Sequence, residues 1–163
     1  MKTLIESILA DMDDTLKKGS KDIIKEIKDF LSNIFSLTQQ SKFKISKKPN
    51  KDGKYIVDFK GKHQYDTCVA RYNFEQTSIT NGLFIFGKCE GSFDLRLCKG
   101  LKTLEGCPEY VSGDFVCQSS KLLTSLEHAP KEVGGDFCCS KCGKQFSEAE
   151  IKKISNVKGK IIV

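Results

Sequence analysis

Cysteine is the residue type in this chain with the widest range of possible chemistry, and the 163 residues include eight of them. Cys139 and Cys142 form a CxxC pair, with Cys138 directly before it, and this spacing occurs in zinc sites and in thiol redox centres. A zinc site needs about four converging ligands, whereas the chain has one CxxC pair, and its two histidines, His63 and His128, lie far apart. A thioredoxin-like centre places CxxC at a helix N-terminus, but here the pair follows a strand pattern. We therefore predict neither a metal site nor a cofactor.

A 22-residue repeat gives most of the cysteines an ordinary packing role. The segment GDFVC at 113–117 returns as GDFCC at 135–139, and GSFDL at 91–95 holds the same frame one step earlier. Cysteine packs as a small apolar side chain. Six of the eight occupy interior positions of this frame. Cys117 and Cys139 share the inward strand position of Leu95, and Cys98 and Cys142 share the position of Ser120, the polar ladder position where cysteine commonly replaces asparagine. Cys89 and Cys107 fall at core positions. Cys138 is expected to point outward, Cys68 has no assigned position, and disulfides are not expected.

Two aspartates also recur in register. Asp114 and Asp136 are 22 residues apart, so their carboxylates fall on neighbouring strands. Paired carboxylates can perform acid–base chemistry, but their repetition favours a structural role in which they accept backbone N–H groups at a turn. Metal binding by this pair is the less favoured alternative. The sequence contains no nucleophile–base pair in a triad context and no phosphate-binding glycine loop, so we predict that the chain is not an enzyme.

The repeat itself predicts the architecture. A fixed period near 20 residues is typical of a solenoid, in which each unit buries its apolar face against its neighbours. Strands near 92–96, 114–118 and 136–140 should pair in parallel in one curved sheet, with Phe93, Phe115 and Phe137 stacked inside. After the repeats, the capping box at 147–150 should open a short helix with Ile151 and Ile154 facing inward. Residues 157–163 should add a terminal strand, which together with the helix forms a C-terminal cap.

Two further units are expected before the repeats, which gives an α+β fold with segments at 1–41, 42–82 and 83–163. Apolar residues at helical spacing predict one helix over 1–18 and another from Ser20, separated by Gly19, as a helical hairpin that covers the first coil. Alternation around Asp52–Gly53 predicts a β-hairpin of 43–46 with 55–59. Residues 67–72 could be a strand and a degenerate first repeat, and 83–86 is a short apolar strand.

The net charge of +6 is concentrated in one stretch. Residues 1–41 carry a net charge of −1 and residues 63–163 carry +1, whereas residues 42–62 carry eight lysines and two acids. Such a segment can attract phosphates or an acidic protein face, although a solvated hairpin is the simpler interpretation and the segment has no arginine. The basic positions are Lys42, Lys44, Lys47, Lys48, Lys51, Lys54, Lys60 and Lys62. No apolar run is long enough for a membrane span and no signal peptide is evident, so a cytoplasmic location is expected.

The repeat resembles a leucine-rich repeat. The matching positions are Phe115, Cys117, Ser120 and Leu122 for the strand side, and Leu123, Leu126 and Val133 for the return side. The short unit with Pro130 is similar to repeats of secreted bacterial effectors, and segments 123–139, 142–148 and 157–163 are similar to repeat proteins of tailed bacteriophages. The resemblance implies a solenoid that presents surfaces to partners, and it transfers no catalytic residue. This chain departs from the pattern in lacking Asn at the ladder position and in having His128 where glycine is typical.

We therefore expect a non-catalytic protein-binding module, phage-encoded and acting on a host protein, with inhibition of a host defence system as one version. A structural or packaged virion component and a nucleic-acid binder acting through residues 42–62 are the alternatives. The partner and the oligomeric state stay open. The expected binding surface is the set of outward strand positions, which should form columns: Ser92, Asp114 and Asp136; Asp94, Val116 and Cys138; Arg96, Gln118 and Ser140.

Overall fold

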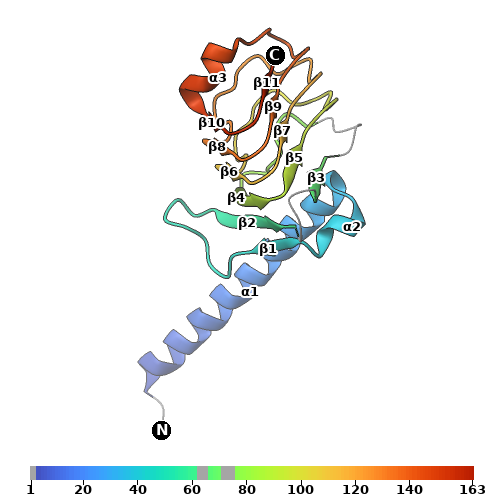
Figure 1. Cartoon of the computed structure of the whole chain (residues 1–163). Helices are drawn as coiled ribbons and strands as arrows, with labels where there is room; N and C mark the ends of the chain where they lie inside the picture. Colours follow the sequence, from blue (N-terminus) through green and yellow to red (C-terminus); the bar gives the residue numbers. More distant parts are fainter. Residues whose placement is uncertain (1–2, 62–65, 71–75) are drawn as a thin grey trace.

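The computed structural model describes residues 3–61, 66–70 and 76–163. It begins with a single long helix, α1, Leu4–Ile34, which extends away from the rest of the chain (Figure 1). Thr3 caps this helix: its side chain accepts a hydrogen bond from the Glu6 N–H, and Glu6 in turn accepts one from the Thr3 N–H. The short helix α2, Leu37–Gln40, follows directly. Among the described helices, none is both long enough and apolar enough to cross a lipid bilayer.

The predicted break at Gly19 is wrong. Two N-terminal helices are present, but α1 runs through Gly19, and the second helix is only four residues long. A glycine inside a helix costs only about 1 kcal/mol relative to alanine. The apolar positions before and after Gly19 fall on the same helical face, so one straight helix satisfies both. The C-terminal part of that face is buried, with Ile27, Leu31 and Ile34 all at most 1% exposed.

The predicted β-hairpin is confirmed. Strand β1, Phe43–Ile45, pairs antiparallel with β2, Tyr55–Lys60, in a register that places Phe43 opposite Phe59. The turn between them includes Gly53, whose φ of 75° lies in the region that glycine favours. β2 then pairs in parallel with β4, Phe84–Glu90, which joins the hairpin to the coils that follow.

The coils form a solenoid with two parallel sheets. One sheet continues from β4 through β6 (Tyr110–Val111), β8 (Glu132–Val133) and β10 (Asn156–Val157). The other contains β3 (Thr67–Val69), β5 (Ser92–Asp94), β7 (Phe115–Val116), β9 (Phe137–Cys138) and β11 (Ile161–Ile162). Each coil passes once through each sheet, so the strands of one sheet come from successive coils (Figure 1).

The predicted parallel strands and their stacked phenylalanines are confirmed. Phe93 pairs in register with Phe115, and Phe115 with Phe137. All three side chains are fully buried, and the Phe93 and Phe115 rings stack with centroids 6.3 Å apart. The possible strand at 67–72 is present as β3, which pairs in parallel with β5, while residues 71–75 lie outside the described residues. The second sheet, by contrast, was not predicted as a sheet.

The N-terminal elements extend the same core. Phe35, which follows α1, lies 5.8 Å from Phe86 of β4, and Phe86 lies 5.2 Å from Phe93 of the first coils, measured between ring centroids. These rings connect the end of α1 to the interior of the solenoid. The N-terminal helix therefore covers the first coils, as expected from the exposed end of a repeat array.

The C-terminal cap is present as a helix and two short strands. Helix α3, Glu148–Ile154, starts with a capping box between Ser147 and Glu150, and β10 and β11 follow it. Ile151 is fully buried, as predicted, but Ile154 is 42% exposed. The inward position predicted for Ile154 is therefore wrong, because the short helix buries only one side chain beneath it.

One corner has the same unusual backbone conformation in three successive coils. Leu97, Ser119 and Lys141, each 22 residues from the next, have φ values of 59°, 61° and 56°. Residues other than glycine, asparagine and aspartate rarely adopt this left-handed region. Its recurrence shows that the coils share one backbone path as well as one side-chain pattern.

Candidate binding site

The first predicted column, Ser92, Asp114 and Asp136, is a hydrogen-bonding ladder between coils. The Ser92 hydroxyl accepts a hydrogen bond from the Asp114 N–H at 2.9 Å, and Asp114 Oδ1 accepts one from the Asp136 N–H at 2.8 Å. Asp136 Oδ1 continues the pattern by accepting from the Lys160 N–H at 2.7 Å. The structural role predicted for the two aspartates is therefore confirmed.

The second column, Asp94, Val116 and Cys138, is in register but is not the exposed surface that was predicted. Asp94 and Val116 are only 4% and 7% exposed. Arg96 lies over Asp94 and donates to its carboxylate from Nε at 2.7 Å. Val116 lies in β7, the central strand of its sheet, in register with Asp94 on one side and Cys138 on the other, so that side chains of both neighbouring strands flank it.

The third column offers little more free surface. Arg96 is exposed, whereas Gln118 and Ser140 are half-buried. Their backbone groups connect adjacent coils, because the Leu97 N–H donates to the Gln118 carbonyl and the Ser119 N–H to the Ser140 carbonyl. Most of the predicted site residues thus hold the coils together.

The cysteines occupy the packing positions that the repeat predicted. Cys117 and Cys139 are buried, and the ladder position is filled by Ser120, whose hydroxyl donates to the Leu95 carbonyl at 3.0 Å, and by Cys142, whose thiol lies 3.1 Å from the Cys117 carbonyl oxygen. Burial raises the pKa of Cys139 to about 12.

Cys142 differs from the other cysteines in its acidity. A hydrogen bond from the Cys117 thiol lowers the pKa of Cys142 to about 7, against the opposing effect of burial. The backbone N–H of Ser120 and the charge of Lys121 act in the same direction.

Within the described residues, no group of three or more His, Cys, Asp or Glu side chains is arranged to hold a metal ion.

The basic segment divides into paired and exposed lysines. Lys42 forms an ion pair with Asp66 at 2.9 Å and also lies over the Phe59 ring, and Lys54 is 3.8 Å from Glu105. The exposed lysines that form no ion pair with a described residue are Lys44, Lys47, Lys48, Lys51 and Lys60. Lys62 lies outside the described residues.

A groove of about 680 Å³ runs across the corners of successive coils, and we call it the cross-coil groove. One wall is the β1–β2 turn, with Asn50, Asp52 and Lys54. The other consists of the segments 105–109 and 126–131, which lead into β6 and β8, and Ile154 of α3 also contributes to the lining. Its apolar lining includes Ile85, Phe86, Cys107, Leu126 and Ala129.

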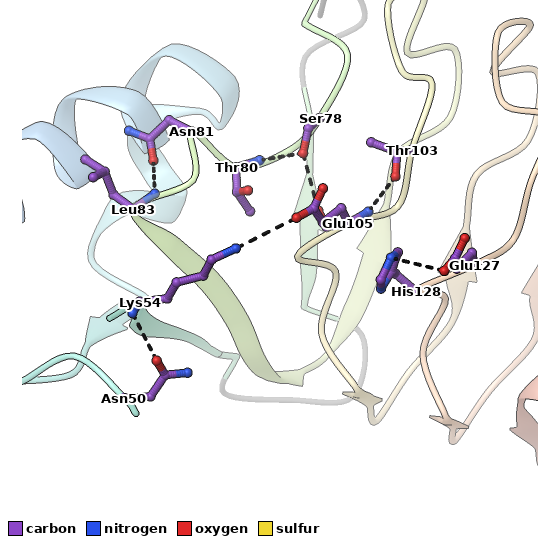
Figure 2. Close-up of polar contacts among 10 residues, drawn as sticks. All are labelled: Asn50, Lys54, Ser78, Thr80, Asn81, Leu83, Thr103, Glu105, Glu127 and His128. Carbon is purple, nitrogen blue, oxygen red and sulfur yellow. Dashed lines mark hydrogen bonds and ion pairs between the residues drawn. The ribbon is translucent and has the colours of Figure 1, made fainter. Parts of the chain in front are cut away.

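The corners that line this groove are built alike. The Thr103 hydroxyl accepts a hydrogen bond from the Glu105 N–H at 3.1 Å, and Ser125 does the same for Glu127. The next residue in each corner has a positive φ: 81° at Gly106 and 66° at His128. His128 thus occupies the position where the repeat favours glycine. The two equivalent turns bring Glu105 and Glu127 to corresponding positions on neighbouring coils (Figure 2).

The groove carries more negative than positive charge. Its lining contains four acids, Asp52, Glu105, Glu109 and Glu127, and two lysines, Lys54 and Lys131. Lys54 reaches across from the hairpin wall to Glu105 (Figure 2), and Lys131 pairs with Glu109 at 2.7 Å. His128 Nε2 lies 3.7 Å from the Glu127 carboxylate. The lining therefore contains two more acids than lysines.

The sequence analysis did not predict this groove, although the sequence indicates one of its two walls. The recurrence of Glu105 as Glu127 within T/S-L-E segments at the 22-residue offset marks an acidic corner. Nothing in the sequence indicates that the turn around Asn50 forms the opposite wall, because that neighbourhood depends on the pairing of β2 with β4.

Comparisons with protein-family models, with curated proteins and with solved structures find no match to this chain.

Proposed function

We propose that this chain is a non-catalytic protein-binding module that holds an extended, basic segment of another protein in the cross-coil groove. The observation that carries this proposal is the groove itself, since buried or half-buried apolar side chains and exposed acidic side chains both line it. Concave, largely apolar sites with a few charged groups are the usual form of binding pockets.

The chemistry of the groove defines the partner segment. Apolar side chains of the segment would contact Ile85, Leu126 and Ala129, and its lysines or arginines would approach Glu105 and Glu127. Complementary charge of this kind contributes mainly to specificity and association rate. Since the groove passes along two neighbouring coil corners and the β1–β2 turn, an extended segment fits it better than a compact ligand.

The repeat's similarity to leucine-rich repeats and to phage repeat proteins supports a partner in the host cell. In this version of the proposal the chain is phage-encoded and acts in the host cytoplasm. Proteins of the host defence are then the first class of partner to test.

A library of displayed random 12-residue peptides tests the proposal directly. We expect the purified chain to enrich peptides with lysine or arginine beside apolar residues, and the Glu105→Lys/Glu127→Lys variant to lose that enrichment. Glu90→Lys/Glu132→Lys is a matched control, because these are exposed acids outside the groove. No enrichment by the wild-type chain, or equal enrichment by the groove variant, would contradict the proposal.

The exposed lysines of the β-hairpin favour nucleic-acid binding as a second candidate function. Five of them form no ion pair with a described residue, so they are available to phosphates. Binding that rests on phosphate contacts weakens steeply with salt. Retention on DNA or RNA that falls with salt, and that is lost in a Lys44, Lys47, Lys48 and Lys51 to Glu variant, would support this function instead.

A further inference from the structure

The repeat places the inward strand position of one coil beside the ladder position of the next coil. The Ser120 hydroxyl donates to the Leu95 carbonyl at 3.0 Å, and the Cys142 thiol makes the equivalent contact one coil later, 3.1 Å from the Cys117 carbonyl oxygen. The Cys117 thiol also donates a hydrogen bond to the Cys142 sulfur. Of these two contacts, only the second brings two cysteines together, and both are free thiols in the structure.

The two sulfurs differ in their access to solvent. Cys117, directly after β7, is fully buried. Cys142 is half-buried and lies in a turn in which Lys141, Gly143 and Lys144 are all exposed. A dissolved oxidant can therefore reach Cys142, while Cys117 is protected from it as long as the coils are folded.

The surroundings of Cys142 favour its thiolate, which is the form of cysteine that oxidants attack. The Lys121 ammonium is held at the same corner, because it donates to the Lys141 carbonyl at 2.9 Å. The hydrogen bond from the Cys117 thiol, together with the charge of Lys121, lowers the pKa of Cys142 to about 7.

Cys138, the other partly exposed cysteine, has the opposite surroundings. Burial and the nearby carboxylate of Asp136 raise its pKa. Exposure alone therefore does not make a cysteine of this chain reactive, and Cys142 is distinguished by its partners across the coil boundary.

We propose that Cys142 is a site of reversible oxidation by hydroperoxides, and that Cys117 is the thiol that converts the oxidised form into a disulfide between two coils. Oxidation-sensitive cysteines are typically acidic, accessible to solvent and placed next to a second, resolving cysteine. The Cys117–Cys142 pair has all three properties. This site is separate from the cross-coil groove, and it adds a chemical modification to a chain that we propose is not a catalyst.

The reaction has two steps. The Cys142 thiolate attacks the terminal oxygen of the hydroperoxide, the O–O bond breaks, and the released alkoxide takes up a proton and leaves as an alcohol, or as water when the oxidant is hydrogen peroxide. Cys142 is thereby oxidised by two electrons to a sulfenic acid. The Cys117 sulfur then attacks the Cys142 sulfur, the S–O bond breaks, and the departing hydroxyl takes the Cys117 proton and leaves as water. Two thiols and one hydroperoxide thus yield one disulfide, one alcohol and one water.

Cys139, the other member of the CxxC pair, is the alternative resolving thiol. It is buried, and burial raises its pKa to about 12. The hydrogen bond to the Cys142 sulfur comes from Cys117 rather than from Cys139. Pairing with Cys117 joins two coils, whereas pairing with Cys139 would close a small ring within one turn, so peptide mapping separates the two.

Peptide mapping of the folded full chain after treatment with hydrogen peroxide tests the proposal. Trypsin cleaves after lysine, so it releases Cys142 in peptide 142–144, Cys117 in peptide 103–121, and Cys138 with Cys139 in peptide 132–141. We expect a disulfide between peptides 103–121 and 142–144 before any other cysteine pair forms, with fragmentation locating it at Cys117 rather than Cys107. Dithiothreitol should reverse it completely.

Three variants assign the roles. In Cys117→Ala the resolving thiol is absent, so oxidation of Cys142 should stop at the sulfenic acid, which dimedone traps. Cys142→Ser should lose both products, and it keeps a hydroxyl at the ladder position, as Ser120 does in the preceding coil. Cys138→Ser is the matched control, because it removes the other partly exposed thiol and should leave the disulfide yield unchanged.

Two outcomes would overturn the proposal. A disulfide that joins peptides 132–141 and 142–144 would remove Cys117 from its role, and a wild-type Cys142 that hydrogen peroxide oxidises only after the chain is unfolded would remove the site. An unchanged melting temperature of Cys142→Ser would show that its loss of both products does not come from unfolding. None of these measurements involves a peptide bound in the cross-coil groove, so this proposal and the proposed function can fail independently.

Discussion

Replacing Phe115 by alanine should remove the central member of the phenylalanine stack. The Phe115 ring is fully buried, with its centroid 6.3 Å from that of Phe93 and 5.1 Å from that of Phe137. Truncating a buried phenylalanine to alanine costs about 3–5 kcal/mol through lost transfer free energy and the cavity left behind. We expect a value in this range, because Phe115 is packed between two other coils that cannot close the space without breaking their own strand pairing.

The measurement is urea denaturation of the purified chain, supported by its melting temperature. For a chain of this size, each kcal/mol shifts the melting temperature by about 2–4 °C, so the variant should melt about 6–20 °C lower. Leu122 is 46% exposed in the same coil, so Leu122→Ala should change the free energy of unfolding by at most about 0.5 kcal/mol. A loss below about 1 kcal/mol for Phe115→Ala, or equal losses for both variants, would refute the stacked core.

Three further changes test the ladders, corners and thiols. Asp114→Ala should lower the free energy of unfolding by about 0.5–1.5 kcal/mol, and Asp114→Asn by less because it retains Oδ1 as an acceptor; equal losses in urea denaturation would contradict the ladder. His128→Gly should raise the melting temperature, since glycine adopts a positive φ without the cost of about 1–2 kcal/mol that other residues incur. A lower melting temperature would contradict the positive φ of residue 128. Cys142 should be the first cysteine alkylated, at a rate that rises as the pH passes through about 7, because the thiolate is the nucleophile and its pKa is lowered to that value. Cys139, whose pKa burial raises to about 12, should react only after unfolding, and mass spectrometry that finds it labelled first would show the assignment to be wrong.

The parts of the fold that the sequence predicts are those encoded by a repeated spacing. Phe93, Phe115 and Phe137 recur at a fixed offset, and so do the aspartates of the ladder, so parallel pairing and its hydrogen bonds follow from the period alone. The capping box at Ser147 predicts α3 for a similar reason, since its signal lies within four residues.

The failed predictions depend on contacts between distant residues. Glycine at position 19 is a local signal for a helix end, but the common apolar face on both sides of it outweighs that signal. Alternation predicts that Val116 points away from the core, but it does not predict that neighbouring strands and side chains bury it. The cross-coil groove needs the β1–β2 turn beside the coil corners, and no short sequence pattern encodes that placement.

The left-handed corners at Leu97, Ser119 and Lys141 restrict which insertions and deletions this chain can accept. Inserting one residue between two corners would move every later ladder group and phenylalanine out of step with the coil before it. Copying a complete unit, such as residues 113–134, would instead reproduce the corner, the ladder acceptor and the stacked ring together. The protein can therefore be lengthened or shortened by whole units of 22 residues, as a modular array, with the groove extended or reduced by one corner at each step.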